Sequence, residues 1–222
     1  MKIISYKEAS ENSNLKYFSN ELWVTEELHE NPDFIKDFGV KKNHRGDFDY
    51  DNTKAMEDGL CSFRDEIRYI LQAINGKQNL RGKTILDLGC GTIKNRSGFE
   101  SWGSDYGKYG FDPWLCRLLP YLGVKTIGID IDNLDNEKFE HYSLNLLEPN
   151  SLSFLQDNSI DIAHTRWFFN SPTLMKMVYE EKFNQFDENN YEQYKKAKEK
   201  LMNLLVPQLE RIVKPEGLFI YG

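Results

Sequence analysis

The chain has 222 residues, of which 40% are hydrophobic and 14% aromatic, enough for one core with a small helical addition. Its formal net charge of -7 disfavours broad binding to nucleic acid or to an anionic membrane. The three cysteines are widely spaced, and no apolar run is long enough for a membrane span or a leader, so we expect a soluble cytoplasmic protein with reduced thiols.

Residues 1–80 are expected to form a polar, mostly helical region. Helices are predicted near residues 19–30 and 31–38, and Pro32 suits the first turn of the second one. Residues 39–54 lack apolar periodicity and predict a loop. Apolar residues then recur at steps of four and three, which predicts one long helix with a buried stripe: Met56, Leu60, Phe63, Ile67, Ile70 and Ile74.

From residue 83 onward, apolar strand patterns alternate with helical patterns. The predicted strands cover residues 83–88, 125–131, 141–147, 159–167 and 218–221. The predicted helices cover 112–123, with Asp112 as cap, then 151–156 and 189–213. This alternation predicts an α/β fold with a doubly wound, mostly parallel sheet over residues 81–222, preceded by the helical region of residues 1–80.

The first of these strands ends in the glycine-rich turn "DLGCG", residues 87–91. Such turns bring the backbone close to a ligand, and ligands of doubly wound sheets lie at the carboxyl ends of the strands. No GxxxxGK[ST] phosphate loop is present, and a GxGxxG dinucleotide pattern would need a third glycine where the chain has Lys94. Nicotinamide and flavin binding are therefore disfavoured.

Three segments, "ILDLGCGT" (85–92), "VKTIGIDID" (124–132) and "IVKPEGLFIY" (212–221), occur in the order typical of one family. Together they resemble the class I, Rossmann-like methyltransferases that use S-adenosylmethionine. The resemblance covers residues 83–222 and implies S-adenosylmethionine as cofactor. It implies the following cofactor-binding residues: Asp87, Gly89, Cys90 and Gly91 under the methionine part, Asp130 and Ile131 at the ribose, and Asn145 and Leu146 at the adenine.

The residue types suit those roles. Glycines let backbone N–H groups approach the donor's carboxylate, and a carboxylate such as that of Asp130 can accept both ribose hydroxyls. The amide oxygen of Asn145 can accept a hydrogen bond from the adenine amino group. Cys90 is interpreted as a small buried residue and not as a nucleophile.

The chain departs from the family pattern in two places. Ile93 replaces a further glycine, and residues 94–111 form an aromatic insert that is either a lid over the site or a surface loop. The family sheet gains two strands after the fifth, whereas this chain stops at Gly222, as a truncated or a minimal version. The edge of residues 218–221 is then exposed unless another chain, as in a homodimer, or the N-terminal region covers it.

The end of the fourth strand, "AHTRWFFNSPT", is where the acceptor is expected. His164 is a candidate general base and Arg166 a candidate ligand for an anionic acceptor, with Trp167 and Phe169 as pocket walls. His164 has an alternative interpretation as a packed, hydrogen-bonded residue. "NSPT" is similar to a motif of base-methylating enzymes, but Ser171 and Pro172 fit better as the start of a helix.

Asp47, Asp49, Asp51 and Asp58 have spacing like that of an EF-hand, but the sixth and twelfth positions do not fit, so no metal site is predicted. The sequence thus predicts an S-adenosylmethionine-dependent methyltransferase for a small-molecule acceptor, without membrane or nucleic-acid partners. The alternatives are a protein or RNA methyltransferase and a non-catalytic binding module.

Overall fold

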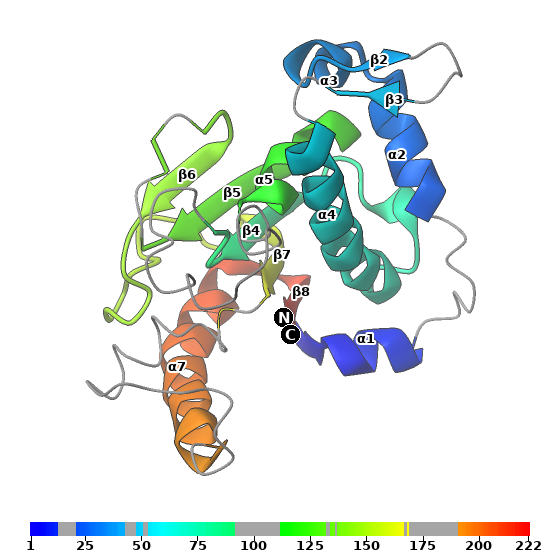
Figure 1. Ribbon diagram of the computed structural model, residues 1–222. Helices are drawn as coiled ribbons and strands as arrows, with labels where there is room; N and C mark the ends of the chain where they lie inside the picture. Colours follow the sequence, from blue (N-terminus) through cyan, green and yellow to red (C-terminus); the bar gives the residue numbers. More distant parts are fainter. Residues whose placement is uncertain are drawn as a thin grey trace.

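The computed structural model describes residues 1–12, 21–42, 48–50, 53–91, 112–131, 134–135, 137–166, 168 and 191–222. At its centre is a six-stranded sheet in the order β1-β8-β7-β4-β5-β6, in which every neighbouring pair is parallel (Figure 1). Its strands are β1 (Lys2–Ser5), β4 (Thr84–Leu88), β5 (Lys125–Asp130), β6 (Glu140–Ser143), β7 (Ile160–Thr165) and β8 (Val213–Tyr221). The predicted α/β fold and its five strands from residue 83 onward are confirmed.

The helices around the sheet are α1 (Tyr6–Asn12), α2 (Glu21–Glu30), α3 (Pro32–Asp37), α4 (Thr53–Ala73), α5 (Trp114–Leu118) and α7 (Tyr191–Ile212), with short 3-10 turns η1 (Lys77–Asn79) and η4 (Leu119–Leu122). A small antiparallel ladder, β2 (Lys41–Lys42) with β3 (Phe48–Asp49), lies within the predicted loop. The predicted apolar stripe is buried from Met56 to Ile70, with Phe63 and Ile70 completely inaccessible, whereas Ile74 follows the end of α4 and is partly buried.

Two local predictions are wrong. Residues 151–156 form turns and not a helix, because side chains of α7 bind their backbone: Arg211 donates to the carbonyls of Leu152 and Leu155, both at 2.8 Å. Asp112 does not cap α5, since its carboxylate accepts a hydrogen bond from Arg117 Nη1 at 3.1 Å and Pro113 is the N-cap.

The sheet separates two apolar layers, because successive residues of a strand face opposite sides. Ile85, Ile162 and Ile220 belong to the core cluster that includes α4 and α5. Leu86 and Phe219, the chain neighbours of Ile85 and Ile220, belong to the cluster that includes α7. Figure 1 shows α4 and α7 on opposite sides of the sheet, so the molecule has helix, sheet and helix layers.

The N-terminal region is not only helical, since its first strand joins the sheet. β1 pairs with β8 in parallel, with Ile4 opposite Ile220, and the Met1 ammonium donates to the Pro215 carbonyl at 2.9 Å. The sequence left open whether another chain or the N-terminal region covers the edge formed by residues 218–221. In the structure the N-terminal region covers it, through β1. A homodimer through this edge would require β1 to be displaced. The division at residue 80 stays a prediction.

Asp161 of β7 forms hydrogen bonds with two other strands, β4 and β8, at the amino edge of the sheet. Its Oδ2 accepts a hydrogen bond from the Thr84 N–H at 2.9 Å, and its Oδ1 accepts one from Lys214 Nζ at 2.9 Å. Burial raises the pKa of the Asp161 carboxyl, but these hydrogen bonds and the charges of Lys214 and Lys83 outweigh burial and hold that pKa below its ordinary value.

We expect Asp161→Asn to lower the free energy of unfolding by about 1.5–3 kcal/mol at neutral pH. A carboxyl whose pKa is lowered in the folded state stabilises the fold above its unfolded pKa of about 3.9, and this contribution is lost as the pH falls through the folded-state pKa. The difference between variant and unsubstituted protein should therefore shrink in acid. Urea unfolding at neutral pH and below about pH 3 measures both values; equal differences would contradict the prediction.

Candidate functional site

The glycine turn after β4 is joined to the end of β5 by backbone hydrogen bonds. The N–H groups of Gly89 and Cys90 both donate to the Ile129 carbonyl, at 2.7 and 3.0 Å, and the Gly91 N–H donates to Asp130 Oδ2 at 3.0 Å. Gly89 and Gly91 have φ angles of 70° and 94°, in the region that favours glycine. The turn and the acid of the next strand are thus one hydrogen-bonded unit.

The other predicted cofactor residues lie along the same edge. Ile131 follows β5 and is 44% exposed, whereas Leu146 is buried in the α7 layer. Asn145 follows β6, and its Oδ1 accepts a hydrogen bond from the Leu147 N–H at 3.0 Å, which closes a local turn. Cys90 is 8% exposed, and burial raises the pKa of its thiol. The structure brings these residues together; their contacts with a donor stay predictions.

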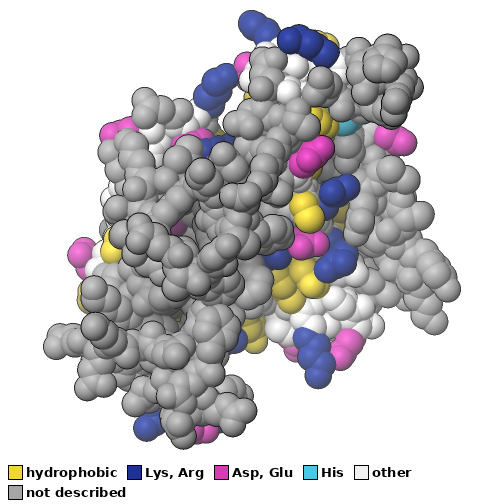
Figure 2. Space-filling view, viewed as in Figure 1, with side chains coloured by type: hydrophobic (Ala, Val, Ile, Leu, Met, Phe, Trp, Pro, Cys, Tyr) yellow, Lys and Arg dark blue, Asp and Glu magenta, His cyan; other side chains and the backbone are white. Residues whose placement is uncertain are grey.

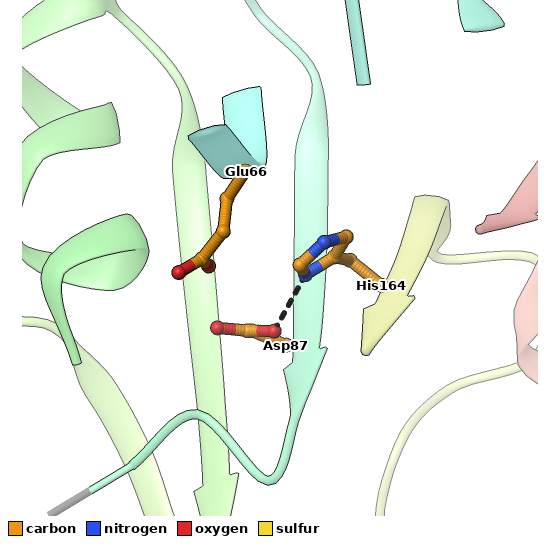
Figure 3. A group of neighbouring side chains, drawn as sticks. All are labelled: Glu66, Asp87 and His164. Carbon is orange, nitrogen blue, oxygen red and sulfur yellow. Dashed lines mark hydrogen bonds and ion pairs between the residues drawn. The ribbon is translucent and has the colours of Figure 1, made fainter. Parts of the chain in front are cut away.

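Asp87 and His164 meet side by side at the centre of the sheet. They are paired in the register of β4 and β7, and His164 Nδ1 lies 2.8 Å from Asp87 Oδ1 (Figure 3). Because a carboxylate only accepts hydrogen bonds, Nδ1 carries the proton. His164 Nε2 lies 2.5 Å from the hydroxyl of Tyr6, whose ring stacks on Tyr69 with centroids 4.0 Å apart. Both ring nitrogens of His164 therefore have partners.

Glu66 of α4 is the third member of this group. One ligand atom each of Glu66, Asp87 and His164 lies within 4.8 Å of the others. Glu66 Oε1 accepts hydrogen bonds from Ser62 Oγ at 3.1 Å and from Arg166 Nη1 at 3.3 Å. Burial raises the pKa of the Glu66 carboxyl, and the negative charge of Asp87 raises it further. Two carboxyl groups thus share a nearly dry space.

The two predicted catalytic residues lie close together but are turned toward the protein itself. His164 is completely inaccessible to solvent. Arg166 is tied to α4, since its guanidinium also donates to the Ser62 carbonyl at 3.2 Å and lies 3.4 Å from Asp65 Oδ2. In this geometry His164 matches its alternative interpretation as a packed, hydrogen-bonded residue. Catalytic roles for both residues stay predictions.

Sequence reasoning missed Tyr6 and Glu66. The available signal for Glu66 was its place next to Ile67, at the margin of the buried stripe on α4. No pattern near Tyr6 pointed to His164. Several predicted features lie outside the described residues: Ile93, the insert 94–111, Trp167, Phe169, the helix expected after Ser171, and the side chains of the EF-hand-like acids.

A comparison with models of known protein families finds no match, and a search of characterised proteins finds none either. Among the described residues, no helix has both the length and the apolar character needed to cross a membrane. The geometry of the sheet edge therefore carries the functional argument.

Proposed function

We propose that the chain is a methyltransferase that binds S-adenosylmethionine at the carboxyl edge of β4 and β5 and acts on a small-molecule acceptor. The observation that carries this proposal is the hydrogen bond from the Gly91 N–H to Asp130 Oδ2, at 3.0 Å. It places a glycine turn and a strand-end carboxylate at one point of a parallel sheet.

The position in the sheet supports the proposal. The strand order β1-β8-β7-β4-β5-β6 runs from β4 through β5 to β6 in one direction and from β7 to β8 in the other. The order reverses between β4 and β7, and ligands of open α/β sheets bind at such a switch point, outside the carboxyl ends of the strands. The glycine turn begins at this point.

The residues present also fit the chemistry of the donor. S-adenosylmethionine carries an amino-acid end and a ribose diol, and its sulfonium supplies an activated methyl group. The glycine turn offers backbone N–H groups without a Cβ in the way. The carboxylate of Asp130 has several acceptor positions, so it can accept ribose hydroxyls while it holds the Gly91 N–H.

The acceptor is inferred to be small because the chain is acidic. On the face shown in Figure 2, the described residues carry positive and negative side chains side by side, without a broad basic field of the kind that nucleic acid needs. Methyl transfer from a sulfonium is an in-line displacement that depends on positioning, and it needs a base only if the acceptor must lose a proton.

The proposal is tested by calorimetric titration with S-adenosylmethionine and S-adenosylhomocysteine. We expect dissociation constants on the order of micromolar, and binding at least about tenfold weaker for Asp130→Asn. This variant keeps an oxygen for the Gly91 N–H and loses only the charge. Asp161→Asn is the matched control, because Asp161 accepts a backbone N–H of β4 at the opposite edge of the sheet.

Each outcome has a distinct meaning. Binding that Asp130→Asn weakens and Asp161→Asn leaves intact supports the donor site. Equal weakening by both variants attributes the loss to the fold and contradicts the assignment of Asp130. No binding by the folded, unsubstituted protein overturns the proposal. Donor binding without methyl transfer to any member of a broad small-molecule panel favours the non-catalytic alternative.

A further inference from the structure

Glu66, Asp87 and His164 converge on one point from three different elements, the helix α4 and the adjacent strands β4 and β7 (Figure 3). Their ligand atoms, one imidazole nitrogen and two carboxylate oxygens, lie within 4.8 Å of one another. The separation of the three residues in sequence explains why no spacing motif pointed to this group. Elements of the scaffold position such a group more firmly than loops do.

We propose that Glu66, Asp87 and His164 bind a divalent cation of the transition-metal type, with Zn²⁺ or Co²⁺ as representative ions. This site adjoins the donor site proposed above, because Asp87 is also among the residues expected to bind the donor, whereas Glu66 is not. Imidazole together with carboxylates suits such ions, whereas Mg²⁺ and Ca²⁺ favour oxygen ligands alone.

Outer partners already hold each of the three ligands, as they do in metal sites. The hydroxyl of Tyr6 contacts His164 Nε2, and Ser62 Oγ and Arg166 Nη1 donate to Glu66 Oε1. The Cys116 thiol lies 3.8 Å from Asp87 Oδ2. The second oxygen of Glu66, Oε2, accepts no hydrogen bond within the described part of the chain, so it is the atom left to bind a cation.

Accessibility and charge agree with this assignment. The Glu66 side chain is 14% exposed, against 5% for Asp87 and 0% for His164, so a cation reaches the site past Glu66. The guanidinium of Arg166 pairs with two carboxyl groups, those of Asp65 and Glu66, and Asp87 adds a third carboxyl group beside Glu66. A negative balance therefore remains for the cation to compensate.

Binding requires one rearrangement, at His164. Its Nδ1 now faces Asp87 Oδ1 and would present its lone pair to the cation. The ring proton would then reside on Nε2, which would donate to the oxygen of Tyr6, so the hydrogen bond to Tyr6 is kept in the reverse direction. The ring keeps its single proton and its contact with Tyr6, and coordination of the cation replaces the hydrogen bond between His164 and Asp87.

The test uses tag-free, chelator-treated protein titrated with Zn²⁺ by calorimetry and with Co²⁺ by visible absorption, with Mg²⁺ as a comparison ion. We expect one Zn²⁺ per chain, ligand-field bands with Co²⁺ and much weaker binding of Mg²⁺. Glu66→Gln should weaken Zn²⁺ binding at least about tenfold, and Tyr6→Phe by about 10- to 100-fold as an outer partner.

Asp65→Asn is the matched control, because Asp65 also contacts Arg166 but is not one of the three ligands. It should bind Zn²⁺ within a few-fold of the unsubstituted protein. The proposal is overturned if the folded protein binds neither ion, or if Glu66→Gln and Asp65→Asn behave alike, which would indicate an adventitious ion only. Circular dichroism verifies folding, and titration of Glu66→Gln with S-adenosylmethionine reports the donor site independently.

Discussion

Phe63→Ala is expected to lower the free energy of unfolding by about 3–5 kcal/mol. The Phe63 ring is completely inaccessible and belongs to the core cluster that joins α4 and α5 to one face of the sheet. Its removal forfeits the transfer free energy of the ring and leaves a cavity that the rigid surroundings fill only in part. The free energy of unfolding of a typical domain is about 5–15 kcal/mol, so this loss is a large share of it.

Phe154→Ala provides the matched control for this prediction. Phe154 is 43% exposed, and its main aromatic contact is with Tyr142, at 4.3 Å between ring centroids. The same substitution at this partly exposed position should lower the free energy of unfolding by about 1 kcal/mol or less. Denaturant unfolding followed by circular dichroism compares the two variants, and similar losses would show that the cluster around Phe63 does not dominate stability.

Ile4→Asp is expected to detach the first strand from the sheet. Ile4 is 5% exposed, whereas its neighbour Ile3 is 39% exposed, since successive residues of a strand face opposite sides. A carboxylate at the buried position loses its hydration without gaining a partner, at a cost of several kcal/mol. Without β1, the long edge of β8 is bare, and bare edges pair with other chains.

The measurement is the melting temperature together with sedimentation over a range of concentrations. Ile4→Asp should melt lower and associate as the concentration rises, because the edge of β8 becomes available. Ile3→Asp adds the same charge to the same strand on its exposed side and should change stability by no more than about 0.5 kcal/mol. If both variants behave alike, the assigned facing of β1 is wrong.

The centre of the sheet was predictable because β4, β5 and β7 are apolar runs of five or six residues, and β6 follows in the same alternation of strands and helices, but β1 was not predictable. A strand of four residues is too short for periodicity to show, and its partner β8 begins more than 200 residues later. The helix predicted for residues 151–156 was wrong for a related reason. Side chains of α7, which are distant in sequence, bind the backbone of these residues and determine its conformation. Local pattern cannot report a contact made by the far end of the chain.

In the candidate site, too, some positions could be predicted from sequence and others could not. Asp87 lies near the end of β4 and Asp130 ends the adjacent parallel strand β5, so their place at one edge of the sheet could be inferred from sequence. The group of Glu66 and Tyr6 around His164 could not, because it depends on the rotation of α4 and on the docking of β1. A shift of one residue along a helix turns a side chain by about 100°, enough to remove Glu66 from the group.

The pairing of β1 with β8 also sets an order of events during synthesis. Lys2 lies opposite Leu218, so β1 leaves the ribosome long before its partner strand β8 is made. Contacts so distant in sequence form late, after the local ones. Tyr6 follows β1 directly, so its hydrogen bond with His164 is expected to form only after β8 has been made. A nascent chain arrested before β8 would therefore keep this histidine without its phenolic partner.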